Sequence, residues 1–274
     1  MRLLRPLPLL AVLALVAWQE AAAPRAELEL VYLANEGFLA RAGEHTLVID
    51  AFVTEPYGGY AAVPSELFAR LVAREAPFVD VDLVLASHVH ADHFQPAAAA
   101  EFLEAHPELP FVTSPQVLAA LAKAAGAAPG PGCRALLPRP DEVVAETAGG
   151  IRVELLRLPH TGGARTAEVE NLGHLVELGG VRLLHVGDAD VEREELAEYE
   201  LAARAIDVAL VPYWWLGDAA DLAKVRARIG AKHLVAVHVP PAEVAREKAR
   251  LAALDPAILL FEQAGDTRRL ELPR

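Results

Sequence analysis

The sequence predicts a mixed α/β or α+β domain in which two β-sheets pack together and helices cover the outside. Both halves of the chain begin with strand-like stretches and continue with alternating helical and strand-like stretches. A Pro/Gly-rich loop at 126–132 separates the two halves. Apolar residues make up 54% of the 274 residues, which is enough for the core of one large domain.

The first half starts with antiparallel strands. Residues 27–52 form alternating or continuous apolar runs that are interrupted at 35–37 and 42–43, and the last of these strands ends at Asp50. Residues 79–88 predict a further, buried strand. Helical spacing or helix-start signals indicate three helices, at Pro64–Glu75, Pro96–Ala105 and Ser114–Ala125.

The second half repeats this style. Strands are expected at 150–160, within a hairpin at 171–188, at 206–215 and 232–241, and last at 258–261. Helices are expected at 192–205, 220–230 and 242–254.

The N-terminus has the layout of a secretory signal peptide. Arg2 and Arg5 precede the apolar run Leu7–Trp18, and small residues follow. The run is short for a membrane span. We therefore expect export to the periplasm or the exterior, with residues 1–23 removed and one domain over 28–274. The alternative is a leader that stays uncleaved as an N-terminal membrane anchor.

Composition and net charge limit the classes of molecule that the protein is expected to bind. A formal net charge of -13 argues against nucleic acid, because phosphate binding needs a basic face. A small-molecule substrate is expected instead, without stable membrane insertion unless the leader is retained. The oligomeric state has no signal in the sequence. Cys133 is the single cysteine, so an internal disulfide is excluded, and we expect a passive thiol in a loop.

The stretch "SHVHADHF" at 87–94 is the strongest functional signal. Its three histidines and one aspartate are either a polar loop or half of a metal site. Three further residues of metal-binding types, His160, Asp188 and His238, each lie at the end of a separate predicted strand. Ligand sites in α/β folds gather at the ends of strands. The combined set is His88, His90, Asp92, His93, His160, Asp188 and His238. Ser87 and Phe94 are expected only to pack around the cluster.

Imidazole and carboxylate groups suit zinc, iron or manganese and require no thiolate. Seven ligands are too many for one tetrahedral ion that must also leave a position for water. Two divalent ions that share one carboxylate use all seven and leave room for a bridging hydroxide.

The motifs "LVIDAF", "SHVHADH", "LPHTGG", "HVGD" and "AVHV" occur in this order. With them the chain resembles the metallo-β-lactamase superfamily of binuclear hydrolases over about residues 28–265. The resemblance implies a four-layer αββα sandwich of two mixed sheets with helices outside, with the metals at one edge. It also implies zinc as the usual metal, with iron or manganese fitting the same ligands.

The resemblance implies a role for each ligand. His88, His90 and His160 correspond to the ligands of one metal; Asp92, His93 and His238 correspond to those of the other, and Asp188 to the bridge. Asp50 corresponds to an acid that orients ligands. The catalytic residues expected are Asp188 and Asp92, the latter as a proton carrier. His185 and His174 are interpreted from the residues alone as supporting groups or hydrogen-bonded core residues.

Departures from the family narrow the activity. Lactam-cleaving members carry a cysteine at the position of Asp188, glyoxalase-II-like members have a longer histidine-rich motif around His160, and flavo-di-iron members carry a glutamate at His90. The remaining expectation is a metal-dependent hydrolase of a small ester, lactone or phosphodiester. The alternatives are a nucleic-acid phosphodiesterase and a metal-binding or sensing module without catalysis.

Four other residues are candidates for the pocket wall. Tyr213, Trp214 and Trp215 follow a predicted strand at the expected metal edge, where they either pack in the core or form an apolar wall for the substrate. Arg165 lies just beyond "HTGG" and is either a surface arginine or a partner for an anionic group.

Overall fold

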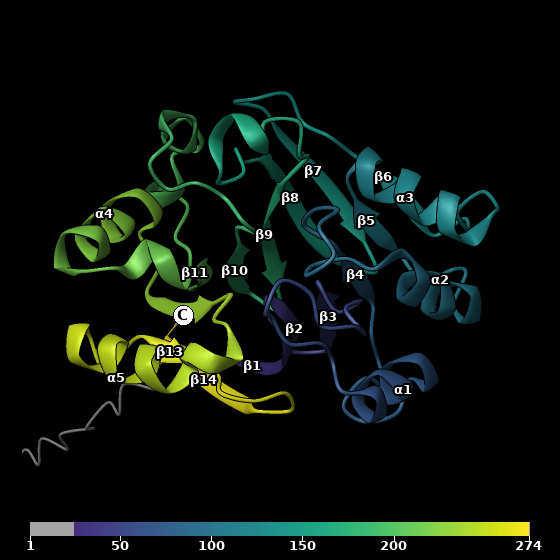
Figure 1. Ribbon diagram of the computed structural model, residues 1–274, viewed down its shortest axis with the longest axis horizontal. Coiled ribbons are helices and arrows are strands. Elements are labelled where there is room, and N and C mark those ends of the chain that lie inside the picture. The colour runs from purple at the N-terminus through teal and green to yellow at the C-terminus, as the bar shows by residue number, and fades with distance from the viewer. Residues whose placement is uncertain (1–24, 274) are drawn as a thin grey trace, which may run out of the picture.

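Two seven-stranded sheets pack face to face, and helices lie on the outer side of each (Figure 1). This computed structural model describes residues 25–273, so the predicted leader at 1–23 lies outside the described residues. The helices α1 to α3 lie on one side and α4 and α5 on the other, with the strands between them. The predicted αββα sandwich is confirmed.

The first sheet is mixed. Its N-terminal strands pair antiparallel, whereas β3, β4, β5 and β6 run parallel to one another. The order across the sheet is β14 (Thr267–Pro273), β1 (Arg25–Ala34), β2 (Gly37–Ala42), β3 (His45–Ile49), β4 (Leu83–Leu85), β5 (Phe111–Thr113) and β6 (Cys133–Ala135).

The second sheet has the same design. Its first strands form an antiparallel meander, and β10 to β13 are parallel. The order is β13 (Leu259–Leu260), β12 (His233–Val237), β11 (Val208–Pro212), β10 (Val181–His185), β9 (Leu172–Leu178), β8 (Ile151–Arg157) and β7 (Val143–Ala148).

Within residues 25–273, five α-helices cover the sheets: α1 (Ser65–Ala73), α2 (Pro96–Ala105), α3 (Pro115–Ala125), α4 (Ala219–Ile229) and α5 (Val244–Leu254). Local signals explain where helices start. The Ser114 hydroxyl accepts from the Val117 N–H at the start of α3, and the Asp218 carboxylate accepts from two N–H groups at the start of α4. Such caps satisfy donors that have no partner inside the helix.

Three apolar cores correspond to the three contacts between layers. The central core lies between the sheets and includes Leu28, Leu83, Leu183 and Val235, each at most 1% exposed. The second core packs the first sheet against α1 to α3, and the third packs the other sheet against α4 and α5. Side chains alternate between two faces along a strand, so each sheet contributes to two cores.

Several elements differ from the prediction. Residues 192–205 form two short 3-10 helices, η2 (Glu194–Tyr199) and η3 (Leu201–Ala203), because Glu200 takes a left-handed φ of 48° between them. Cys133 begins a strand instead of lying in a loop. Strands β5, β6, β7 and β14 were not predicted, and β14 follows the strand that was expected to be last.

These omissions have physical reasons. β5 and β6 have only three residues each, too few for a periodic pattern. β14 reads "TRRLELP" and is an edge strand with charged side chains, which resembles a loop in composition. Among residues 25–273, no helix has the length and apolarity that crossing a membrane requires.

The central core predicts a stability effect. Leu183→Ala should lower the free energy of unfolding by about 2–5 kcal/mol, because the truncated side chain leaves a cavity between the sheets. Denaturant unfolding measures this. The control is Val79→Ala at a position that is 51% exposed, where a change within about 0.5 kcal/mol is expected. Equal effects at both positions would contradict this location of the core.

Candidate metal centre

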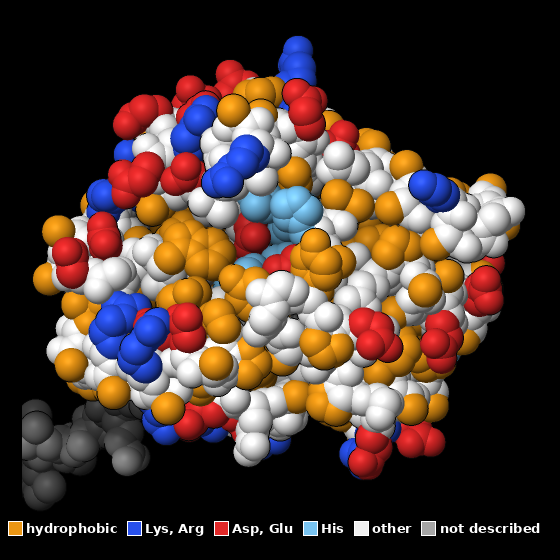
Figure 2. Space-filling model, viewed as in Figure 1, with side chains coloured by type: hydrophobic (Ala, Val, Ile, Leu, Met, Phe, Trp, Pro, Cys, Tyr) orange, Lys and Arg blue, Asp and Glu red, His pale blue; other side chains and the backbone are white. Residues whose placement is uncertain are grey.

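The seven predicted ligands come together at one edge of the sandwich. "SHVHADHF" follows β4, and its chain turns where the N–H groups of His93 and Phe94 donate to the His90 carbonyl. His160 follows β8, and Asp188 and His238 follow β10 and β12. Figure 2 shows histidine and acidic side chains at the bottom of a hollow, with apolar side chains beside it.

The first group contains three histidines. The His90 Nδ1 atom lies 3.1 Å from Nε2 of His88 and 3.1 Å from Nε2 of His160, and the latter two atoms are 3.3 Å apart. His88 is fully buried, and the other two are half-buried. With zinc–nitrogen bonds of about 2.0–2.1 Å, ligand nitrogens in a tetrahedral site are separated by about 3.3 Å. The triangle therefore fits one zinc-sized ion.

The second group contains Asp92, His93 and His238. The Nε2 atoms of the two histidines are 3.0 Å apart, and the Asp92 Oδ2 atom lies 3.4 Å from Nε2 of His238 and 3.9 Å from Nε2 of His93. All three residues are buried. The ligand atoms of each group lie within 4.8 Å of one another, with Asp188 belonging to the first.

The Asp188 carboxylate lies between the groups and presents one oxygen to each. Its Oδ1 atom is 3.3 Å from Nε2 of His93 and 3.1 Å from Nε2 of His238. Its Oδ2 atom is 3.4 Å from Nε2 of His160 and 3.9 Å from Nε2 of His88. Oδ1 is buried and has no hydrogen-bond partner in the part of the chain that the structure describes. A bridging carboxylate needs this placement, so the donor set fits two metal ions.

The Nδ1 atoms of His160 and His93 have partners that leave their Nε2 atoms available, whereas Nδ1 of His238 has no hydrogen-bond partner among the described residues. His160 Nδ1 lies 2.5 Å from the Thr161 carbonyl, and His93 Nδ1 lies 2.9 Å from Oδ2 of Asp50. When Nδ1 carries the proton and donates it, Nε2 has a free lone pair for a metal.

Asp50 organises the cluster, in the position expected for it. Its Oδ1 atom accepts from the Ser87 N–H at 2.7 Å, and its Oδ2 atom accepts from the Ser87 hydroxyl at 2.6 Å as well as from His93. The Ser87 hydroxyl also lies 3.1 Å from Nδ1 of His88. The expectation that Ser87 only packs was therefore wrong, because its hydroxyl links the acid to a ligand of each group.

Gly187 and Asn171 position Asp188. Gly187 has a φ of +56°, and a Cβ there would lie 2.3 Å from Oδ1 of Asn171. This oxygen accepts from the Asp188 N–H at 3.2 Å, and the Asn171 amide donates to the carbonyls of Leu158 and Val186. The segments that hold His160 and Asp188 are thus tied together. Asn171 was not among the predicted site residues, although it is the first residue of the predicted hairpin at 171–188.

His185 lies below the cluster, next to a buried acid that the sequence analysis also missed. Its Nδ1 atom accepts from the Gly187 N–H, and its Nε2 atom is 3.2 Å from the Glu36 carbonyl and 3.4 Å from Oε2 of Glu36. The proton therefore lies on Nε2, which prevents this nitrogen from binding a metal. Glu36, Asp50 and His185 form a support for the centre and no third metal site.

Burial and neighbouring charges shift the pKa values of the side chains in the cluster. Burial alone lowers the pKa of His93 and of His238, but the Asp188 carboxylate outweighs it. The pKa of His93 is then well above its ordinary value, and that of His238 rises to about 9. Burial raises the pKa of Glu36 to about 8. Metal binding must displace the protons on both histidines.

Two aromatic rings contact His238. The Tyr60 ring centroid is 4.2 Å and the Trp214 ring centroid 4.9 Å from that of His238. Of the other wall candidates, Tyr213 bonds Glu243, and Trp215 is buried and donates to the Ala189 carbonyl. Tyr60 had no signal in the sequence, because its loop reaches the site only through the folded chain.

Comparisons with known proteins show the family and the fold. Residues 45–258 match the family model described as the β-lactamase superfamily domain. The comparison with curated proteins finds no significant match.

Solved structures show the same fold. They include Igni18, a metallo hydrolase from the hyperthermophilic archaeon Ignicoccus hospitalis KIN4/I, with 17% identity, a TM-score of 0.61, and 90% of this chain and 99% of that chain covered. An isothiocyanate hydrolase from Delia radicum gut bacteria has 15% identity, a TM-score of 0.58 and coverage of 89% and 99%. CmlA, a diiron β-hydroxylase from Streptomyces venezuelae, has 12% identity, a TM-score of 0.56 and coverage of 92% and 55%.

His174 makes stability depend on pH. It faces His185 across β9 and β10, and neither of its ring nitrogens has a hydrogen-bond partner among the described residues. It is thus not the hydrogen-bonded core residue that was expected. Burial lowers its pKa to about 3. The part of the free energy of unfolding that depends on neutral His174 is fully present above the pKa of histidine in the unfolded chain, about 6.5. It is lost as the pH falls toward 3, because in this range only the unfolded chain binds the proton.

His174→Leu should therefore reduce the loss of stability between about pH 6.5 and pH 3 by several kcal/mol, at about 1.4 kcal/mol per pKa unit. Denaturant unfolding at a series of pH values measures it. Leu183→Ala is the control, because it should lower stability without changing the slope. An unchanged slope in His174→Leu would show that His174 does not carry this effect.

Proposed function

Because the chain belongs to the metallo-β-lactamase superfamily of metal-dependent hydrolases, we propose that it hydrolyses a small-molecule ester, lactone or phosphodiester at a two-metal centre. The observation that carries the proposal is the Asp188 carboxylate, with Oδ1 facing His93 and His238 and Oδ2 facing His160 and His88. One ion with an open position for water would not need a carboxylate divided in this way.

In this proposal each ion is held by its own group of residues. His88, His90 and His160 would hold one, Asp92, His93 and His238 the other, and Asp188 both. Bound there, the pair would lower the pKa of a coordinated water toward neutrality and polarise an oxygen of the substrate. Nitrogen and carboxylate donors suit zinc, iron and manganese, and we propose zinc.

The chain itself contributes the surroundings of the reacting groups. Asp92 Oδ2 lies at the surface of the second group, and although burial alone raises its pKa, hydrogen bonding to His238 keeps that pKa below its ordinary value. The carboxylate is therefore ionised at neutral pH and can accept a proton, which it returns to the leaving group. Tyr60 and Trp214 both pack against the buried ring of His238 and limit access of water to it.

The substrate is expected to be small and not a nucleic acid. The chain has a net charge of -13, and a polynucleotide would be repelled by it. A sensing module without catalysis is the other alternative. The complete set of seven converging ligands favours catalysis, because a purely structural ion needs four ligands and no open position.

Removing one ligand tests the proposal. His160→Ala should release one of two bound ions and lower kcat/KM by at least about a hundredfold on whichever generic ester, lactone or phosphodiester the wild type hydrolyses. Elemental analysis measures the metal and a chromogenic panel measures turnover.

The matched control is His233→Ala, at the opposite end of the strand that leads to His238, and it should keep both metal and activity. Wild-type turnover with two ions in His160→Ala would contradict the assignment. Two ions in the wild type without hydrolysis of any substrate in the panel would favour the sensing module.

A further inference from the structure

A cavity of about 480 Å³ is lined in part by His160, and neither His238 nor its aromatic neighbours line it. Its floor is the end of β8 and the residues that follow it, from Arg157 to His160. The segment around Gly163 to Val169 and the start of η2 complete the wall. A molecule in this cavity would therefore lie against a ligand of the first metal group.

Arg157 places a positive charge in this cavity. It is half-buried, it ends β8, and it lies three residues before His160. Within residues 25–273 its guanidinium has no hydrogen bond or ion pair. A half-buried cation without a partner is unusual, because burial removes water that would otherwise stabilise it.

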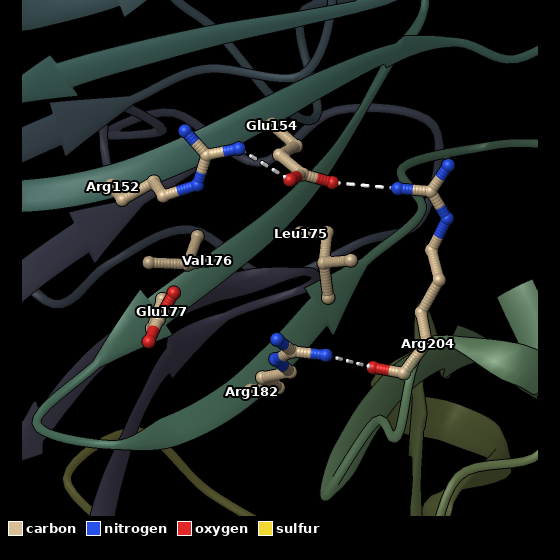
Figure 3. A pocket seen from close by; sticks show the side chains of 7 residues that line it. All are labelled: Arg152, Glu154, Leu175, Val176, Glu177, Arg182 and Arg204. Atoms are coloured by element: carbon tan, nitrogen blue, oxygen red, sulfur yellow. Dashed lines mark hydrogen bonds and ion pairs between the residues drawn. The ribbon is translucent and has the colours of Figure 1, made fainter.

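The other arginines on the same strand and nearby are paired. Figure 3 shows Glu154 between two of them, with its Oε1 atom 2.7 Å from Nη2 of Arg152 and its Oε2 atom 2.6 Å from Nη1 of Arg204. Arg182 donates to the carbonyl of Arg204. Each of these three guanidinium groups donates at least one hydrogen bond, so the missing partner of Arg157 is not a general property of the arginines in this part of the protein.

The second arginine that lines the cavity, Arg193, already has a carboxylate partner. Arg193 is exposed and forms two hydrogen bonds, of 2.6 and 3.2 Å, with the Glu195 carboxylate. The cavity lining thus carries a net charge of +1 from Arg157, in a chain with a net charge of -13. Arg165, expected to be either a surface arginine or a partner for an anionic group, is exposed and does not line this cavity.

The rest of the lining is largely apolar and includes Leu158, Pro159 and Val169. Such a surface fits a short hydrocarbon chain and offers it few hydrogen bonds. An arginine recognises carboxylate and phosphate groups through two parallel hydrogen bonds.

We propose that the substrate carries a carboxylate or phosphate group at the end of a short hydrocarbon chain, that this anion binds Arg157, and that the scissile bond lies at the metal centre. The inference rests on the proposed function for the reacting bond, but the anion subsite stands on the cavity alone.

Binding is tested first, by titration calorimetry of the metal-loaded full chain with hexanoate, hexyl phosphate and hexan-1-ol. Arg157→Ala should weaken the preferred anion about tenfold, the loss expected for one partly exposed charge-assisted contact, and Arg157→Lys should retain part of the affinity. Arg152→Ala is the matched control on the same strand and should bind as the wild type does. The stronger of the two anions identifies the group.

Turnover is tested with two matched esters, the mono-4-nitrophenyl ester of glutaric acid and 4-nitrophenyl pentanoate. Hydrolysis of the first breaks its acyl C–O bond, consumes one water and releases glutarate and 4-nitrophenol. In Arg157→Ala the ratio of kcat/KM for the anionic over the neutral ester should fall about tenfold. Thermal unfolding checks that each variant is folded, as expected for a side chain without described partners.

The outcomes separate the two proposals. Anion binding that is the same in Arg157→Ala and the wild type overturns the subsite, and hydrolysis without dependence on Arg157 does so while the hydrolase proposal stands. Binding that depends on Arg157, without hydrolysis of either ester or of any lactone or phosphodiester in the panel, supports the subsite and counts against the hydrolase proposal.

Discussion

The Asp50 carboxylate is the group on which the metal centre depends. It accepts the N–H and hydroxyl of Ser87 and Nδ1 of His93, all while fully buried. These bonds join the end of β3 to the segment after β4 and turn Nε2 of His93 toward Asp188. A buried carboxylate is costly without donors, so the same interactions that orient the ligands also make the burial of Asp50 tolerable.

The fold turns distant sequence positions into one site through the ends of its strands. His160, Asp188 and His238 leave β8, β10 and β12 at the edge where β4 delivers the histidine cluster. Asn171 ties two of these exits together. This arrangement places polar side chains at one end of the central core. One of them, His174, is buried there without a hydrogen-bond partner among the described residues, which is unfavourable for stability. Such local penalties are common where function requires buried polar groups.

Much of this arrangement was predictable, and the remainder depends on packing. The ligands could be found because four metal-binding side chains are clustered within 87–94 and three more follow predicted apolar strands. The αββα layers agree with the prediction, and the fold brings the seven side chains together. Glu36 and Tyr60 could not, because they reach the centre only when the two sheets and the intervening loops are assembled. For the same reason no sequence signal pointed to Arg157, which lines the cavity, whereas Arg165 is the surface arginine that was one of its two expected roles.

Diffraction from crystals of the protein grown with zinc, recorded on both sides of the zinc absorption edge, tests the central claim most directly. If two metal ions share Asp188, two anomalous peaks should lie about 3.5–4 Å apart, one next to His90 and one next to Asp92, with an oxygen of Asp188 facing each. A single peak, or a peak among Glu36, Asp50 and His185, would contradict it.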